Sequence, residues 1–447
     1  MAKKIAQAKY LLIGNSAGGI GAAEAIREMD KAGSIAIVSD EPYPVYSRPL
    51  ISEYLAEKCT LERMLFRPSD FYEKNDIQTF LGKKVKQLDP AEHKVELEDG
   101  SKIRWEKLLL ATGGSPIMPK IEGLEKRGVF TFTTLDDTKA IDQCLTGKAR
   151  AVVIGGGLLG VSATEALAKR GVEVAIVEMK ERILNVMLDE EASSMEEEAL
   201  KRLGVNIITG HTVAKINSGL SGEIVSSVTL DDGNRLLCNL VVLAIGVLPR
   251  AELAADAGIK INRGIVVDRY MRTSHPDVYA CGDAAEAYDF IYGENRLTPV
   301  WPNAYLGGRV AGFNMAGIPT EYQGGTALNS LKYFGLDVIS AGMVNPPNES
   351  YEKVSRRNGN IYRKVILKNG FIAGMVFVGN IEKSGIVYNL MKDSIKVDGF
   401  RQALVADDFG LVSLPEEIWR KRLEIPLSVQ GAPLTAVEEP VEAAVGE

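Results

Sequence analysis

Short apolar runs alternate with helical patterns through the first part of the chain. One run covers residues 10–13, and a second covers 35–38 after a glycine-rich turn and a helical stretch. The same order recurs between an apolar run at 151–154 and another at 174–177. Short buried strands joined through a helix are typical of parallel βαβ units. The repetition therefore predicts an α/β fold with two related units.

Each glycine-rich turn has small residues at the spacing of a dinucleotide-binding loop. The first residue permits a tight turn, the second lets backbone amides approach a pyrophosphate, and the third lets the helix pack closely on the strand. A phosphate then lies at the positive end of the helix. One such turn alone also arises for packing reasons, and Ser16 replaces the middle glycine of the first copy. The residues predicted to bind are Gly14, Ser16, Ala17, Gly18 and Gly19 in the first unit, and Gly155, Gly157, Leu158, Leu159 and Gly160 in the second.

An acidic residue closes the second strand of each unit, Asp40 in the first and Glu178 in the second. A carboxylate at this place accepts hydrogen bonds from the hydroxyls of an adenosine ribose. We therefore expect Asp40 and Glu178 to bind the riboses of two dinucleotides. A 2′-phosphate would meet a like charge at Glu178, so the second unit is predicted to prefer NADH over NADPH.

A further apolar run follows each unit, at 108–114 and at 240–246, and ends in a turn of small residues. Such a run suits a central parallel strand whose carboxyl end meets a ligand. An ordinary buried strand with a turn has the same pattern. On the first interpretation, the ligand-facing residues are Ala111, Thr112, Gly113 and Gly246.

Charge and hydropathy exclude several classes of function. The formal net charge is −7, and the stretch 426–447 holds acidic residues but no Lys or Arg. The chain lacks the basic excess that nucleic-acid binding requires. The apolar run after the basic N-terminus is too short for a signal sequence, and no run approaches the ~18 residues of a membrane span. We expect a cytoplasmic protein that binds no nucleic acid and does not insert into membranes.

The four cysteines, Cys59, Cys144, Cys238 and Cys281, stand far apart without CxxC spacing. This spacing argues against a metal cluster or a dithiol formed by sequence neighbours. We expect each cysteine to be a buried, small apolar residue. The three histidines are not spaced for metal binding either, so the sequence predicts no metal site.

The segment 273–285 reads Thr-Ser-His-Pro-Asp-Val-Tyr-Ala-Cys-Gly-Asp-Ala-Ala. It resembles the second FAD signature of the flavoprotein reductases that carry two dinucleotide folds, and the resemblance extends over about 10–423. It implies that the protein uses FAD and NADH/NAD+ as cofactors. It also implies that Asp283 hydrogen-bonds the ribityl chain of FAD and that the turn at Gly282 meets the flavin pyrophosphate.

The same resemblance implies two Rossmann-like dinucleotide-binding domains and an α+β C-terminal domain. Alternating segments at 362–367 and 372–378 predict antiparallel strands in that last domain. The expected boundaries are 1–116 and 247–322 for a discontinuous FAD domain, 117–246 for the NAD domain, 323–425 for the C-terminal domain and 426–447 for a disordered acidic tail.

The branch of the family follows from an absence. Relatives that work through a disulfide or a single redox cysteine carry sulfur near the flavin, whereas residues 46–53 contain none. The chain resembles the rubredoxin-reductase, ferredoxin-reductase and nitrite-reductase branch, which implies an iron–sulfur carrier as the electron acceptor. By this resemblance Arg48, Pro49, Val85 and Trp301 are expected near the flavin, with Trp301 just before a helix that begins near Asn303.

Two acidic residues, Glu53 and Glu165, have predicted roles near the flavin and the nicotinamide. Many relatives have Lys where Glu53 stands, paired with a Glu that corresponds to Glu165. Two facing carboxylates would repel each other and raise at least one pKa, which would tune the flavin or the choice of acceptor. Alternatively, Glu53 points to solvent and has no such role. Glu165 is the residue expected to help to place nicotinamide, unless it is an exposed helical Glu.

Hydride transfer needs position more than acid or base groups, because the cofactor carries the chemistry. The leading prediction is an NADH:acceptor oxidoreductase that passes electrons from FAD to a ferredoxin- or rubredoxin-type protein, in either direction. One alternative is an NADH oxidase that reduces oxygen or another small molecule at the flavin. Another is a redox-sensitive, nucleotide-bound interaction module. A homodimer is left open by the resemblance.

Overall fold

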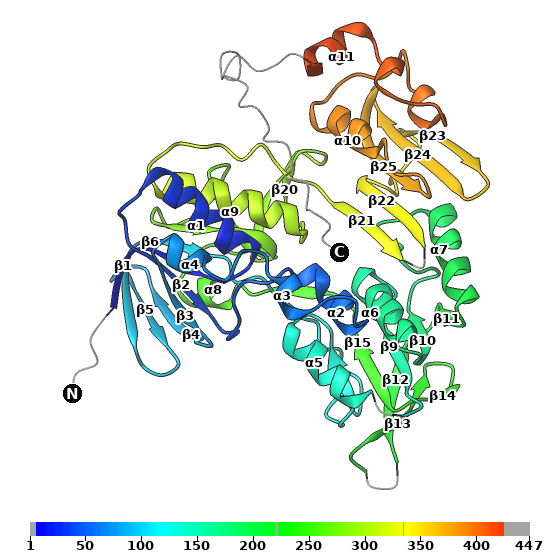
Figure 1. Cartoon of the computed structure of the whole chain (residues 1–447), viewed down its shortest axis with the longest axis horizontal. Coiled ribbons are helices and arrows are strands. Elements are labelled where there is room, and N and C mark those ends of the chain that lie inside the picture. The colour runs from blue at the N-terminus through cyan, green and yellow to red at the C-terminus, as the bar shows by residue number, and fades with distance from the viewer. Residues whose placement is uncertain (1–5, 146, 220–221, 334, 424–447) are drawn as a thin grey trace, which may run out of the picture.

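The computed structural model describes residues 6–145, 147–219, 222–333 and 335–423. The predicted acidic tail, 426–447, lies outside these residues. Three bodies are visible in Figure 1: one at the left built from the start of the chain and the yellow-green helix α9, one at the lower right, and the C-terminal body above it. No helix in the described part of the chain is both long and apolar enough to cross a membrane.

The first body is a seven-stranded sheet of order β3-β2-β1-β6-β5-β4, with β18 paired to β6. The pairs of β1 with β2 and β6, of β2 with β3, and of β18 with β6 are parallel. Its strands are β1 (Ala6–Ile13), β2 (Ile35–Ser39), β3 (Ile77–Leu81), β4 (Val85–Asp89), β5 (Lys94–Leu97), β6 (Lys102–Leu110) and β18 (Val278–Ala280). Its helices are α1 (Ala17–Met29), η1 (Arg48–Leu50), α2 (Ile51–Leu55), α3 (Leu61–Met64), α4 (Phe71–Lys74), α8 (Glu252–Asp256), η2 (Gly282–Ala284) and α9 (Trp301–Met315), and a small sheet adds β17 (Ile265–Val266), β19 (Ala285–Asp289) and β20 (Glu294–Arg296).

The second body is a parallel sheet of order β11-β10-β9-β15-β8. Both predicted βαβ units and both predicted central strands are therefore present. The elements of this body are β8 (Val129–Thr131), α5 (Leu135–Cys144), β9 (Arg150–Ile154), α6 (Leu158–Lys169), β10 (Glu173–Glu178), α7 (Glu190–Arg202), β11 (Asn206–Thr209) and β15 (Leu240–Leu243), with an antiparallel layer of β12 (Val213–Ser218), β13 (Val225–Leu230) and β14 (Arg235–Leu237).

Helices α1 and α9 pack backbone to backbone, although they lie far apart in the sequence (Figure 1). A Cβ added to Gly308 would lie 2.0 Å from the carbonyl oxygen of Gly18. A Cβ on Gly312 would lie 2.5 Å from that of Ala22. Only glycine permits this approach. Helix α9 begins at Trp301 rather than near Asn303, because Pro302 fits the first turn, where an amide hydrogen is not required.

Two antiparallel strands, β7 (Gly114–Pro116) and β16 (Val247–Pro249), join the first and second bodies. Gly114 pairs with Pro249, and Pro116 pairs with Val247. The chain therefore leaves the first body and returns to it through one short ladder. The predicted domain boundaries at 116 and 247 fall in this ladder and stay a prediction.

The C-terminal body is an antiparallel sheet of order β21-β22-β25-β24-β23, as predicted for 362–367 and 372–378. Its two faces have different partners, since Val376 and Val378 join the core of the second body while Met375 and Phe377 face the helices of the C-terminal body. Its elements are β21 (Leu328–Tyr333), β22 (Leu336–Gly342), β23 (Glu352–Asn358), β24 (Ile361–Lys368), β25 (Phe371–Val378), α10 (Ser384–Lys392), η3 (Ala403–Val405), η4 (Leu411–Ser413) and α11 (Glu416–Leu423).

Candidate functional site

The first glycine of each predicted turn meets the end of the neighbouring central strand. Gly14 has φ +124°, and a Cβ there would lie 2.1 Å from the carbonyl oxygen of Ala111. Gly155 has φ +107°, and its Cβ would lie 2.5 Å from the carbonyl oxygen of Ala244. Residues other than glycine rarely adopt this backbone conformation, and the neighbouring carbonyl group occupies the place where a Cβ would lie. The duplicated turns thus have the same geometry in both bodies.

The third glycine of each turn lets the helix approach the strand, as predicted. A Cβ on Gly19 would lie 2.0 Å from the carbonyl oxygen of Gly14, and one on Gly160 would lie 1.8 Å from that of Gly155. Neither helix has a side-chain cap at its N-terminus. Ser16, the N-cap of α1, makes no capping hydrogen bond, and the N-cap of α6 is Gly157, which has no side chain. The first amide groups of both helices are therefore open to a phosphate. Ala17, Leu158 and Leu159 lie in these first turns.

The segment 273–285 lies directly against the first turn. A Cβ on Gly18 would meet the sulfur of Cys281 at 2.7 Å. Gly282 has φ +71° and starts the short helix η2, which contains Asp283. Burial raises the pKa of Asp283, and the positive charge of Arg48 opposes that rise. Residues that the sequence places far apart, Gly18, Arg48 and Asp283, thus converge on one place.

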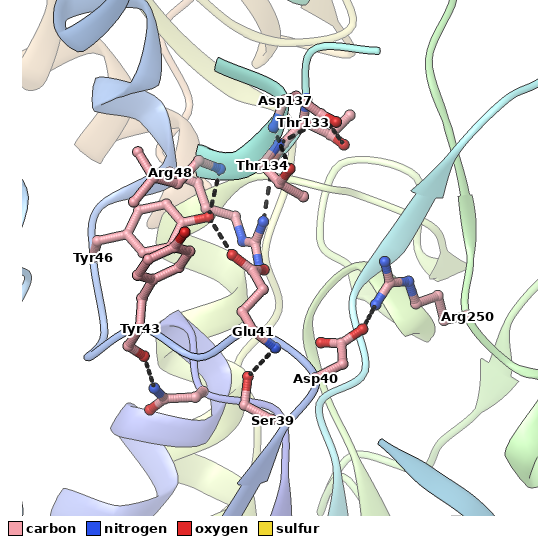
Figure 2. Close-up of polar contacts among 12 residues, drawn as sticks. Ser39, Asp40, Glu41, Tyr43, Tyr46, Arg48, Thr133, Thr134, Asp137 and Arg250 are labelled. Atoms are coloured by element: carbon pink, nitrogen blue, oxygen red, sulfur yellow. Dashed lines mark hydrogen bonds and ion pairs between the residues drawn. The ribbon is translucent and has the colours of Figure 1, made fainter. Parts of the chain in front are cut away.

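Arg48 is fixed by residues of both bodies (Figure 2). Its guanidinium forms an ion pair with Glu41, and Nη1 donates a hydrogen bond to the carbonyl oxygen of Thr133 at 3.1 Å. The hydroxyl of Tyr46 donates to Oε2 of Glu41 at 2.6 Å and accepts a hydrogen bond from the amide of Leu135 at 3.1 Å. Burial raises the pKa of Tyr46, so its hydroxyl stays protonated. The loop after β2 is thereby attached to the start of α5.

The other residues expected near the flavin lie in the first body. Pro49 is in the first turn of η1, next to Arg48. The rings of Trp301 and Phe66 make an edge-to-face contact with centroids 5.2 Å apart. Val85 begins β4 and is partly buried against the first core. Their contact with a flavin stays a prediction.

Glu178 is held against the second turn. Its Oε2 accepts a hydrogen bond from the amide of Gly156 at 2.6 Å, and its Oε1 accepts one from the amide of Lys180 at 2.8 Å. A Cβ on Gly156 would lie 3.0 Å from the Cβ of Glu178, so the middle glycine of the run 155–157 makes room for the acid. Gly246, with φ +113°, follows β15 at the same edge of the sheet. Sequence reasoning missed Gly156, although its position between two predicted glycines marked it.

Asp40 has a partner that the sequence did not identify. Its Oδ2 lies 2.8 Å from Nη1 of Arg250, the residue after β16 (Figure 2). The backbone around Arg250 is bound to the turn after β6, because Thr112 Oγ1 donates to its carbonyl oxygen at 2.6 Å and its amide donates to the carbonyl oxygen of Gly113 at 2.9 Å. The predicted ligand-facing turn 111–113 thus lies beside the predicted ribose acid.

Glu165 lies close to another acidic residue, Glu196 of α7. It is buried, its Oε1 lies 2.7 Å from Nζ of Lys169, and its charge acts on Glu196 of α7. Arg170, the residue after α6, donates a hydrogen bond to the carbonyl oxygen of Leu55 in α2 at 2.9 Å. Glu53 is half-buried on α2, and the predicted roles of Glu53 and Glu165 both stay predictions.

Comparisons with known proteins decide the family. Residues 8–308 match the pyridine nucleotide-disulphide oxidoreductases. The chain belongs to this family. Residues 328–395 match the rubredoxin NAD+ reductase C-terminal domain, which lies in the C-terminal body. The match explains why the first two bodies carry duplicated dinucleotide turns and why a third body follows them.

Several relatives match this chain over most of its length. The epsilon subunit of an NADH-dependent phenylglyoxylate dehydrogenase from Aromatoleum evansii is 32% identical over 426 residues, which are 94% of this chain and 100% of the relative. An NADH-rubredoxin oxidoreductase from Clostridium acetobutylicum is 30% identical over 376 residues, 83% of this chain and 91% of the relative. The solved putidaredoxin reductase in covalent complex with putidaredoxin has a TM-score of 0.83 at 25% identity, and the match covers 93% of this chain and 99% of that one.

These findings confirm the expected enzyme class, an FAD-dependent oxidoreductase that uses NADH. The residues present fit both cofactors. Each turn has a glycine cradle that any Cβ would fill, each following helix has an uncapped N-terminus, and each second strand ends in an acid. The first turn and the segment 273–285 would hold FAD, and the second turn with Glu178 would hold NADH.

The four cysteines of this chain, Cys59, Cys144, Cys238 and Cys281, are free thiols in the described part of the structure. Cys238 and Cys281 are buried as expected, but Cys59 is half-buried and Cys144 is exposed, so the expectation of four buried cysteines was wrong. Cys144 is the last residue of α5, where the helix end meets solvent. Burial raises the pKa of Cys281 to about 12. The cysteine closest to the first turn is therefore a neutral thiol that fills space.

Proposed function

We propose that this protein takes hydride from NADH onto FAD and passes the electrons to a small iron–sulfur protein of the ferredoxin or rubredoxin type. One observation carries the proposal. Both dinucleotide turns are present, the first with Ser16 in place of the middle glycine, while the segment 46–53 and the contacts around Arg48 contain no sulfur. Electrons that arrive from NADH therefore have no protein disulfide to reduce and must leave to an external acceptor.

The residues of the chain act by binding and positioning. The open amides after Gly14 and Gly155 would each receive a pyrophosphate, and Glu178 would receive the ribose of NADH. Arg48 would place a positive charge beside the flavin site, where Glu41 and Thr133 hold it. Bound FAD supplies a hydride acceptor that can give up its electrons singly. No acid or base of the protein is required for that transfer.

A second candidate differs in the partner rather than in the chemistry. The relative from Aromatoleum evansii is a subunit of an NADH-dependent dehydrogenase, and the match covers all of it. We infer that this chain can instead serve as the NADH-reactive subunit of a larger enzyme, with an iron–sulfur subunit as its partner. In that setting the chain would pass electrons from the iron–sulfur subunit to NAD+ as well as from NADH to that subunit.

The test is anaerobic stopped-flow reduction of the yellow full-length protein by NADH, followed by mixing with ferredoxin, with rubredoxin or with air-saturated buffer. Fast loss of flavin absorbance, fast reoxidation by either carrier and slow reoxidation by air support the proposal. Fast reoxidation by air alone would replace it with an NADH oxidase. A long-lived reduced complex that reacts with none of these acceptors would favour the interaction module.

The direction of electron flow is read from the same protein. Mixing the oxidised protein and NAD+ with chemically reduced ferredoxin should produce NADH if the enzyme works reversibly, and its absence would restrict the protein to NADH oxidation. A homodimer and a cytoplasmic location stay predictions of the sequence, and sedimentation equilibrium of the purified chain tests the first.

A further inference from the structure

Arg250 is bound at four points around the end of β2. Besides the ion pair with Asp40, its Nε donates a hydrogen bond to Oγ of Ser115 at 2.8 Å. Its amide and carbonyl are bound to Gly113 and Thr112. The backbone and the side chain are thus both fixed, so the guanidinium is oriented toward Asp40 before any ligand binds (Figure 2).

The two side chains of this ion pair are 35% and 42% exposed. An exposed pair of this kind contributes little, typically well below ~1 kcal/mol. The Asp40 carboxylate accepts the hydrogen bond from Arg250 through Oδ2. The position of Asp40 predicts a ribose hydroxyl as a further partner of this carboxylate.

The charges around this end of the site have a paired arrangement. Asp40 and Glu41 are consecutive acids beside a turn that must receive an anionic pyrophosphate. Each is paired with an arginine from elsewhere in the chain, Asp40 with Arg250 and Glu41 with Arg48. Without these two arginines the acids would repel the pyrophosphate. The pairing lets Asp40 keep the charge that binds ribose hydroxyls while its field on the phosphates is offset.

We propose that Arg250 is a positioning residue for the adenosine end of FAD. It holds the carboxylate of Asp40 in the orientation that binds the ribose and offsets its charge near the pyrophosphate. Because Arg250 directly follows β16, the strand by which the chain returns from the second body, the same contact joins this return to the cofactor site. The proposal rests on the predicted ribose role of Asp40 and does not depend on which acceptor takes the electrons.

The test measures FAD binding by the full-length chain without turnover. The flavin-free protein is titrated with FAD, and binding is followed by the loss of flavin fluorescence, for the wild type, Arg250→Gln, Asp40→Asn and the double variant. Arg150→Gln is the control, because Arg150 forms an exposed ion pair with Glu173 at 3.0 Å in the second body. We expect Arg250→Gln to weaken FAD binding about tenfold, the equivalent of one charge-assisted hydrogen bond, and Arg150→Gln to leave it unchanged.

The double variant and a second readout separate positioning from a structural role. If Arg250 acts through Asp40, the double variant binds FAD about as weakly as the weaker single variant. Thermal unfolding should change only with FAD present, since the pair contributes little to the flavin-free chain. Equal FAD affinity for wild type and Arg250→Gln would overturn the proposal. Losses of FAD affinity that add up in the double variant would also overturn it. So would a fall in the unfolding temperature of Arg250→Gln that is the same with and without FAD. Anaerobic reduction by NADH at saturating FAD tests the proposed function separately.

Discussion

Lys364 and Asp189 form a buried ion pair between the C-terminal body and the second body. Nζ of Lys364 lies 2.7 Å from Oδ2 of Asp189, and the side chains are only 10% and 11% exposed. The hydroxyl of Tyr362 donates to the same oxygen at 2.7 Å. Oδ1 of Asp189 accepts a hydrogen bond from the amide of Ala192 at 3.1 Å and so caps α7. One carboxylate thus caps a helix and fixes the position of the C-terminal sheet.

Replacement of Lys364 by Met should destabilise the chain strongly. It removes one partner of a buried pair and leaves the charge of Asp189 uncompensated, which typically costs about 3 kcal/mol or more. The free energy of unfolding from denaturant titration is the measurement. Lys353→Met on the exposed face of the neighbouring strand β23 is the matched control and should cost little. Equal losses for the two variants would show that the pair has no special role.

Glu196 should make stability fall as pH rises. Burial, reinforced by the charge of Glu165, raises its pKa to about 8. Within the described residues neither of its carboxyl oxygens has a hydrogen-bond partner. The folded chain therefore holds a proton that the unfolded chain releases near its ordinary pKa of 4.5, so stability is lost as pH rises from about 4.5 to about 8.

Glu196→Gln should remove this loss. The variant is expected to match the free energy of unfolding of the wild type near pH 4.5 and to exceed it at pH 8 by on the order of 4 kcal/mol. The unfolding temperature across this pH range is the measurement. Glu197→Gln, the next residue of α7, serves as a control. Parallel pH profiles for the wild type and Glu196→Gln would mean that Glu196 is ionised in the folded chain.

Glu178→Ala should change the choice of nicotinamide nucleotide. Loss of the carboxylate removes the ribose acceptor and the like charge that a 2′-phosphate would meet. We expect the KM for NADH to rise about tenfold and the preference over NADPH to shrink by a similar factor, with the rate at saturating NADH little changed. Steady-state kinetics with ferricyanide provide the measurement. Glu173→Ala, at the exposed start of the same strand, should leave both constants unaltered; a wild-type preference that survives in Glu178→Ala would contradict the assignment.

Gly308→Ala should separate helices α1 and α9. The new Cβ would lie 2.0 Å from the carbonyl oxygen of Gly18, which is backbone and cannot move aside. The expected cost is about 2 kcal/mol, with a loss of bound FAD because Gly18 belongs to the first turn. Gly385→Ala in α10 is the control, since a Cβ there meets no atom within 4 Å. Flavin content after purification and the unfolding temperature decide between them, and full retention of both by Gly308→Ala would refute the close-packing argument.

Sequence patterns were informative where chemistry depends on neighbouring residues. The turns at Gly14 and Gly155 need glycine because of their own backbone angles and the adjacent strand. Asp40 and Glu178 are recognised because each closes a strand at a set distance from such a turn. These features repeat along the chain, and a repeat is visible without coordinates.

Contacts between distant segments were not predictable in this way. Asp40 meets Arg250, and the charge of Glu165 acts on Glu196. Which face a helix such as α6 turns toward a neighbour depends on its rotation and on the packing of all three bodies. No local pattern records that rotation.

The sequence by itself therefore determined the two dinucleotide units, their ribose acids as predictions, and the absence of sulfur from residues 46–53, because each depends on residues close together in the chain. Only the tertiary structure decided which charges are paired, as in Asp40 with Arg250 and Asp189 with Lys364. The physical reason is that an ion pair needs its atoms within a few ångströms, and for residues far apart in the chain only the packing of complete strands and helices brings them there.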